Sequence, residues 1–349
     1  MDNPHSRARW LVYTPAMKFR AVVAGVLVVS CALIAGGCGS KTDDGSGVNA
    51  TAGTGPDGSG GAGGTGNTGI AGTNNGIGNS AGTISLNVDG GDTGGTGSGS
   101  GGSPEVCDGL DNNNNGIIDD IDANADGVCD CLLIATLGVK GTWGAGDVFA
   151  AWLSARSNNG ATDLADQVIT PELIAKYQVI VAQDLHQGHM YSDAEVAALQ
   201  DWVNKGGGLM TLIGYADTSE IMNVNRLLAP FAMNYGNQAI LPKRGGNTIP
   251  ITMWTPHPID MGVTAVGVDT GCEAQGMGDV IATGGGFDVG RVQTVGMGHV
   301  FVWGDEWITY NTEWTQHPDY QLQLFWLNTI KWLTVAGRCQ VEIPPNPPT

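Results

Sequence analysis

The chain has 349 residues, of which 34 are Asp or Glu and only 15 are Lys or Arg, so its formal net charge is −19. Binding of nucleic acids relies mostly on Lys and Arg contacts to phosphate, and this balance argues against a nucleic-acid partner. The 56 glycines concentrate in a tract near the N-terminus, which indicates a chain of several unlike parts.

Residues 1–38 have the features of a secretory leader. From Met17 a short basic segment is followed by an apolar stretch from Ala21 to about Gly37. This stretch is short for a bilayer span and ends in small residues and a cysteine, as a secretory signal does. Because a complete signal begins at Met17, that residue is a candidate for the true start of the protein.

The leader resembles a bacterial lipoprotein signal, in which a cysteine is lipidated and becomes the first residue of the mature chain. Cys38, in the sequence AGGC, is the expected lipidation site, and Cys31, in VVSC, is the alternative. Gly39 replaces the Asp that retains enterobacterial-type lipoproteins at the inner membrane. The resemblance implies acyl chains such as palmitate, membrane attachment through the N-terminal lipid, and a place at the outer membrane or cell surface.

Residues 39–104 are almost wholly Gly, Ser, Thr, Asn and Ala, and this composition predicts a disordered tether. Its roughly 65 residues give a mean reach on the order of 40–50 Å. Only the run from Thr83 to Val88 has the composition of a strand. The tether would hold a folded head clear of a membrane.

Residues 105–130 predict a short neck of calcium-binding loops. Between Asp111 and Asp130 the chain reads DNNNNGIIDDIDANADGVCD, in which two overlapping ladders of oxygen ligands each have a glycine at the sixth position. The expected ligands are Asp111, Asn113, Asn115, Ile117, Asp119 and Asp122 in the first loop, and Asp122, Asn124, Asp126, Val128 and Asp130 in the second. Asp, Asn and Gly are also common turn residues, so a solvated linker is the alternative.

The twelfth position of the first loop is Asp122 rather than the Glu of an EF-hand, and no helical pattern flanks the loops. The segment resembles thrombospondin type 3 repeats, and also a bacterial metal-binding motif that begins Cys-Asp-Gly-x-Asp-Asn, here Cys107 to Asn112. The resemblance covers residues 107–130 only. It implies Ca²⁺ as a structural cofactor.

From Cys131 to about residue 340 the composition is that of one globular domain, and a Pro-rich tail follows at 341–349. Continuous apolar runs predict buried strands at 131–139, 177–183, 209–214 and 299–304. Helical spacing predicts helices at 147–157, 192–208, about 220–231 and about 319–336, with a strand-rich region before about Gly286. Ser192 and Glu195 form a capping box, and Gly206 ends that helix. This alternation predicts an α/β domain with a doubly wound, mostly parallel sheet.

The head resembles the class I glutamine amidotransferase-like fold, in the ThuA-like group. The matching segments are LLIATLG, YSDAEVAALQDWVNKGGGLMTLIGY, NRLLAPFAMNYG, TPHPIDMGV, HVFVWGDEW and FWLNTIKWL. True amidotransferases carry a nucleophilic Cys on the turn that corresponds here to Gly214–Asp217, which holds neither Cys nor Ser; Thr218 and Ser219 are expected to cap the next helix. The family's late His-x-Glu pair also has no match. The resemblance therefore implies the fold without glutamine hydrolysis.

Processing at Cys38 would leave five cysteines, and secretion permits disulfides. Because helices of a doubly wound fold run opposite to the strands, the end of the last helix should lie near the start of the first strand. This geometry predicts a Cys131–Cys339 bond, with Cys107–Cys129 bracketing the calcium loops and Cys272 free. The alternative is Cys272–Cys339.

Candidate ligand-binding residues fall at the carboxyl edge of the predicted sheet, where open α/β sheets bind ligands. The aromatic candidates are Trp143, Tyr215, Trp307, Tyr310 and Trp314. Aromatic side chains beside acids suit a sugar or another polar ring, although the favoured interpretation is that they cover the end of the sheet or pack against Met- and Trp-rich loops. Asp305 and Glu306 are the candidates for catalytic acid and base, but neighbours in an extended chain point apart.

A zinc site at this edge is a further alternative, because Asp184, His186 and His189 follow one strand; polar loop residues are the preferred interpretation. His257, before Pro258, is expected in a turn.

Together these features predict a cell-envelope lipoprotein whose head is a non-catalytic binding module for glycan or an envelope protein. A secreted carbohydrate-active hydrolase using Asp305 and Glu306, and a structural envelope protein, are the alternatives.

Overall fold

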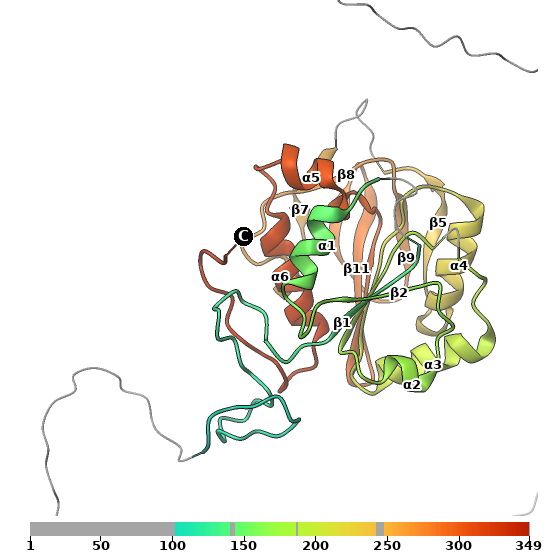
Figure 1. Ribbon diagram of the computed structural model, residues 1–349. Helices are drawn as coiled ribbons and strands as arrows, with labels where there is room; N and C mark the ends of the chain where they lie inside the picture. The colour runs from blue at the N-terminus through green and yellow to red at the C-terminus, as the bar shows by residue number, and fades with distance from the viewer. Residues whose placement is uncertain (1–101, 140–143, 186–187, 242–247, 349) are drawn as a thin grey trace, which may run out of the picture. The chain divides into compact units, whose positions relative to one another are not determined.

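An eight-stranded sheet forms the centre of the head in the computed structural model, which describes residues 102–139, 144–185, 188–241 and 248–348 (Figure 1). Across the sheet the strand order is β2-β1-β3-β4-β12-β11-β10-β7. These strands are β1 (Ile134–Leu137), β2 (Thr162–Ala165), β3 (Val179–Ala182), β4 (Gly208–Thr211), β7 (Met253–Trp254), β10 (Asp279–Gly284), β11 (Phe287–Val295) and β12 (Gly298–Trp303). Two separate pairs join β5 (Met233–Ala239) with β9 (Cys272–Gly276) and β6 (Ile249–Ile251) with β8 (Val266–Val268).

One half of the sheet is parallel and the other is antiparallel. β1 pairs in parallel with β2 and β3, β3 pairs with β4, and β4 pairs with β12. β11, β10 and β7 then follow in antiparallel pairing. β7 and β10 come from the region expected only to be rich in strands, and β11 follows that region and was not predicted. The predicted α/β class with a large, mostly parallel sheet is confirmed.

Helices cover both faces of the sheet. α1 (Asp147–Ser154) and α6 (Leu322–Leu333) lie on one face, and α2 (Pro171–Ile174), α3 (Asp193–Asn204) and α4 (Thr218–Leu228) lie on the other (Figure 1). The short helix α5 (Asn311–Gln316) and the 3₁₀ turns η1 (Ala229–Phe231), η2 (Pro258–Asp260) and η3 (Trp307–Thr309) complete the head.

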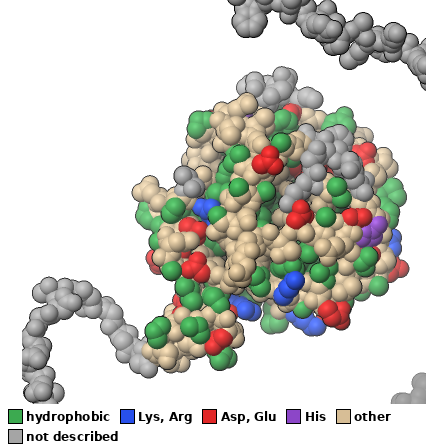
Figure 2. Space-filling view, in the orientation of Figure 1, with side chains coloured by type: hydrophobic (Ala, Val, Ile, Leu, Met, Phe, Trp, Pro, Cys, Tyr) green, Lys and Arg blue, Asp and Glu red, His purple; other side chains and the backbone are tan. Residues whose placement is uncertain are grey.

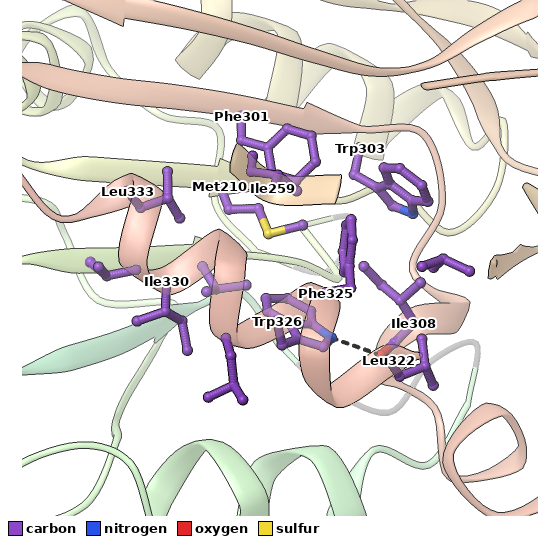
Figure 3. Close-up of a cluster of buried hydrophobic side chains, with 14 of the residues drawn as sticks. Met210, Ile259, Phe301, Trp303, Ile308, Leu322, Phe325, Trp326, Ile330 and Leu333 are labelled. Atoms are coloured by element: carbon purple, nitrogen blue, oxygen red, sulfur yellow. Dashed lines mark hydrogen bonds between the residues drawn. The ribbon is translucent and has the colours of Figure 1, made fainter. Parts of the chain in front are cut away.

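The core under α6 is rich in aromatic side chains, as Figure 3 shows. Phe325 lies 5.0 Å from Trp303 between ring centroids, and Trp326 lies 4.4 Å from Phe149 of α1. The indole N–H of Trp326 donates to the carbonyl oxygen of Ile308 at 3.2 Å, so the one polar group of this large side chain is satisfied inside the core.

Local signals place α3 where the sequence predicts it. The Ser192 hydroxyl accepts from the Glu195 N–H at 3.3 Å, and the Glu195 carboxylate accepts from the Ser192 N–H at 2.8 Å, which is the predicted capping box. Gly206 follows the helix with a φ of +111°, a conformation that favours glycine.

The neck is fastened to the segment that follows α6. Ile118 forms a parallel bridge with Arg338, and the Cys339 N–H donates to the Ile118 carbonyl at 2.8 Å. This pairing brings Cys339 to Cys129, and the disulfides are Cys129–Cys339 and Cys107–Cys131.

The predicted pairs Cys107–Cys129 and Cys131–Cys339 are therefore wrong. The end of the last helix does lie near the start of the first strand, as expected. The tail, however, runs beside the neck, so Cys339 bonds to Cys129 rather than to Cys131. Cys272 is a buried free thiol, as expected.

Several predictions of the sequence lie outside the described residues: the signal with Cys31 and Cys38, the tether up to residue 101, Trp143 and His186. Within the described ranges, no helix has both the length and the apolar character needed to cross a membrane.

Candidate functional site

Glu306 is the centre of a buried polar cluster at the carboxyl edge of the sheet. One carboxyl oxygen accepts from the Asp184 N–H at 2.7 Å, and the other accepts from the Tyr310 hydroxyl at 2.6 Å. Glu220, in the first turn of α4, shares a further hydrogen bond with Glu306. We call these four residues the Glu306 cluster. It ties the ends of β3 and β12 to the start of α4.

Two carboxyl groups that share one buried site cannot both ionise without a large cost in free energy. Burial, and then the charge and hydrogen bond of Glu220, raise the pKa of Glu306 to about 8. Glu306 and Glu220 are both fully buried, so the pair holds a proton near neutral pH and functions as an internal brace.

Asp305 is equally inaccessible. Its carboxylate oxygens accept from the N–H groups of Asp269, at 2.6 Å, and Trp307, at 3.3 Å. Burial raises its pKa well above the usual range. The predicted acid and base are adjacent in space, but their oxygens already have protein partners and neither side chain reaches the surface.

The aromatic candidates separate into two groups. Tyr310 is buried against the Glu306 carboxyl and belongs to the interior. Trp314 is partly buried and packs against the core on Phe149 and Trp152, at centroid distances of 5.9 and 5.4 Å. Trp307 is half-buried beside Tyr310, and Tyr215 is 46% exposed. Tyr215 is the most exposed of these aromatic candidates within the described residues, and Trp307 and Trp314 are each partly buried.

The turn after β4 has no nucleophile. Asp217, rather than the expected Thr218 or Ser219, caps α4, because its carboxylate accepts from the Ser219 and Glu220 N–H groups. Cys272 is fully buried, and burial, followed by the charges of Glu220 and Asp305, raises the pKa of its thiol to about 12. A thiol with this pKa is a poor nucleophile, because the thiolate is the reactive form.

His189 is held by two carboxylates rather than arranged for zinc. Its Nδ1 lies 2.6 Å from Asp166 Oδ1, and its Nε2 lies 2.7 Å from Glu195 Oε1. The hydrogen bond to Glu195, and then that to Asp166, raise the pKa of His189. Both ring nitrogens are engaged by these carboxylates, and His186 of the expected zinc set lies outside the described residues. His257 lies in the turn at η2, as predicted.

The two loops of the neck repeat one hydrogen-bonding pattern. In the first loop the Asp111 carboxylate accepts from the N–H groups of Asn115 and Gly116, at 3.1 and 2.8 Å. The corresponding bonds of the second loop run from the N–H groups of Asp126 and Gly127 to Asp122, both at 3.0 Å.

The agreement between the loops extends to the remaining positions. The third and fifth positions accept from the N–H groups two residues later in both loops, through Asn113, Asn115, Asn124 and Asp126. Positive φ values recur at the fourth and sixth positions, in Asn114 with Gly116 and in Ala125 with Gly127. The sequence ladder is therefore also a structural repeat.

Asp119 does not face the first loop as expected. Its φ is +56°, and its carboxylate accepts from the N–H groups of Asp108 and Gly109 and pairs with Arg338 at 3.0 Å. Asp120 faces the loop instead, where it accepts from the side-chain amide of Asn115 at 2.8 Å. The adjacent acids Asp119 and Asp120 gave no sequence signal that could distinguish them.

The donors of the loops fit a hard cation. Within the described ranges, no group of three or more His, Cys, Asp or Glu side chains is placed to hold a metal ion. The loops also offer Asn side-chain oxygens beside their carboxylates. Calcium prefers such a set of oxygens. In the second loop, burial raises the pKa of Asp126, and the charges of Asp122 and Asp130 raise it further.

The chain matches no protein-family profile and no curated protein sequence. Among solved structures it is similar to the mmIFT52 N-terminal domain, with 14% identity and a TM-score of 0.47 over 58% of this chain and 96% of that one. A cytoplasmic protein from Salmonella typhimurium LT2 gives 17% identity and a TM-score of 0.44 over 58% and 100%. A putative ThuA-like protein from Parabacteroides merdae gives 14% and 0.40 over 62% and 94%.

Proposed function

We propose that the head is a non-catalytic binding module of the cell envelope, for glycan or an envelope protein. The burial of Asp305 and Glu306 carries this proposal, because both acids use their oxygens to hold the fold together. The hydrolase alternative depends on these acids meeting a substrate, and their burial disfavours it. Tyr215 and Trp307 remain as the aromatic surface for a ligand.

Binding and turnover can be measured on the same samples of the full chain. We expect retention of envelope glycan or protein to fall in Tyr215→Ala, with Met222→Ala, at another exposed hydrophobic side chain, as the matched control. No turnover of aryl glycosides or glutamine is expected. If turnover is found, and if Asp305→Asn abolishes it while binding is kept, then the head is an enzyme rather than a binding module.

The neck is proposed to bind structural calcium, on the strength of the repeated loop pattern. Calcium would neutralise carboxylates that repel each other and stiffen the junction between tether and head. Calorimetry of the full chain should show a higher unfolding temperature with calcium than with chelator. Asp122→Asn should reduce this difference, and Asp201→Asn, at an exposed helical position, should preserve it.

Attachment through lipid at Cys38 completes the proposal and follows from the lipoprotein-like leader. Palmitate labelling in a bacterial host should be lost in Cys38→Ser and kept in Cys31→Ser. The opposite pattern would move the lipid to Cys31, and labelling of neither form would remove the anchor.

A further inference from the structure

A cavity lies at the amino edge of the sheet, opposite the Glu306 cluster. It has a volume of about 730 Å³ and lies between the C-terminal half of α6, η2 and the tail. All of its lining residues belong to the described ranges. The volume is within the usual range of small-molecule sites.

Aromatic rings form one wall. Trp332 stacks on His299 with 4.4 Å between centroids and an interplanar angle of 26°, and His257 meets the edge of Trp332 at 5.0 Å. Met261, Leu324 and Ile343 add apolar surface, together with three prolines. This combination favours a flat ring that can stack or slide between apolar side chains.

The tail that makes the facing wall is firmly held. The Gln340 side-chain amide lies within hydrogen-bond distance of four carbonyl oxygens in the last turn of α6 and the segment after it, of which the nearest is that of Thr334 at 3.1 Å. Cys339 is bonded to Cys129, and the Pro348 carbonyl accepts from Arg156, whose guanidinium lies 4.1 Å above the Trp152 ring. The cavity is thus formed before any ligand arrives, which lowers the entropy cost of binding.

The charges around the cavity balance. Lys331 and Glu342 line it with opposite signs. Burial lowers the pKa of both His257 and His299, so these imidazoles are neutral at pH 7. A charged ligand would lose hydration in this cavity, while the opposite charges of Lys331 and Glu342 would largely offset each other's effect on it. An uncharged ligand would lose little hydration free energy.

We propose that this cavity is a binding site for an uncharged aromatic or heteroaromatic ring compound. The site is separate from the carboxyl-edge surface and does not depend on the head binding glycan or protein there.

Photolabelling of the wild-type full chain with benzophenone, an uncharged aromatic probe, tests the site directly. We expect adducts at Met261, Leu324 or Ile343, and loss of these adducts when excess N-phenyl-1-naphthylamine competes. The exposed methionines Met222 and Met253 lie elsewhere and serve as internal controls. Equal labelling of all exposed methionines, or labelling that the competitor leaves unchanged, would overturn the proposal.

Equilibrium binding gives a second readout. N-phenyl-1-naphthylamine fluorescence should saturate, and Leu324→Trp, which fills the cavity, should weaken its affinity at least about tenfold, as expected when a pocket loses its volume. Met222→Trp, at an exposed position of α4, should leave the affinity unchanged. Equal affinity in wild type and in folded Leu324→Trp would contradict the assignment; if that variant does not fold, the photolabelling result decides.

Discussion

Four acidic side chains of the head, Glu220, Asp305, Glu306 and Glu313, have no exposed surface. A carboxyl group in such surroundings favours its neutral form unless strong donors compensate. Burial raises the pKa of Glu313 to about 7, as it raises that of Glu306 to about 8. The carboxyl groups inside the head are therefore partly protonated near neutral pH, although the protein as a whole is strongly acidic and other Asp and Glu side chains lie at its surface (Figure 2).

Glu306→Gln should make the head less sensitive to alkali. The folded pKa of Glu306 is above its ordinary value, so the unfolding free energy falls as pH rises from about 4.5 to about 8. Glutamine imitates the protonated acid and should keep stability at pH 5 within about 1 kcal/mol. Urea unfolding between pH 5 and 9 measures the slope, with exposed Glu172→Gln as control. Equal slopes in wild type and Glu306→Gln would contradict the prediction.

His189 should respond to pH in the same direction for a different reason. Its pKa is raised by Glu195 and then Asp166, so its contribution is complete below its ordinary pKa of about 6.5 and is lost as pH rises through the folded value. Asp166→Asn should lower the His189 pKa in an NMR titration. The cost in stability should be about 1 kcal/mol or less, since Asp166 is well exposed. An unchanged titration would show that Asp166 is not a functional partner of the ring.

At the scale of elements, the neck is a repeated unit that has been adapted for packing. Both loops have the same hydrogen bonds. The Asp119 carboxylate, however, contacts Arg338 and the N–H groups of Asp108 and Gly109 instead of the first loop. A side chain buried in this way supports the joint between neck and tail. The first loop then depends on Asp120 for its later carboxylate.

This division predicts different outcomes for two adjacent substitutions. Asp119→Asn should lower stability by about 1–2 kcal/mol with or without calcium, because it weakens the hydrogen bonds of a buried carboxylate and its pairing with the partly exposed Arg338. Asp120→Asn should leave the calcium-free protein unchanged and reduce calcium affinity. Calorimetric unfolding and calcium titration of both variants give the comparison. If only Asp119→Asn changes calcium affinity, then Asp119, rather than Asp120, is the calcium ligand of the first loop.

Elements with local signals were predictable, and long-range arrangements were not. The capping box at Ser192 and the glycine at 206 define α3 within a few residues of sequence. The Glu306 cluster joins residues 122 positions apart, and Glu220 looks like any acid in the first turn of a helix. The disulfide partners depended on a neck-to-tail bridge for which the sequence gives no local cue.

For the molecule as a whole, two disulfides divide the described chain into closed loops. Cys107–Cys131 spans 24 residues and Cys129–Cys339 spans 210. The smaller loop contains the calcium ladder, and the larger loop contains nearly all of the head. The unfolded state against which the stability of the head is measured is therefore a chain that is already cross-linked near both ends.

Removal of either bond should lower stability, and removal of the longer one should cost more. Chain entropy predicts about 5 kcal/mol for the Cys129→Ser/Cys339→Ser pair and about 3.5 kcal/mol for Cys107→Ser/Cys131→Ser. Urea unfolding under non-reducing conditions measures both values. A larger loss from the shorter loop would show that folded contacts of the neck, rather than chain entropy, decide the effect.

The Cys129–Cys339 bond also determines how the protein would carry a mechanical load. A force applied at the neck is transmitted to the head along two covalent paths, the main chain after Cys129 and the disulfide to Cys339, so the two paths share it. A pull between the neck and the tail bypasses the 210 intervening residues altogether. About 700 Å of contour length is thereby kept out of reach of such a force, and the distance over which the molecule can stretch is set by the segments outside that loop.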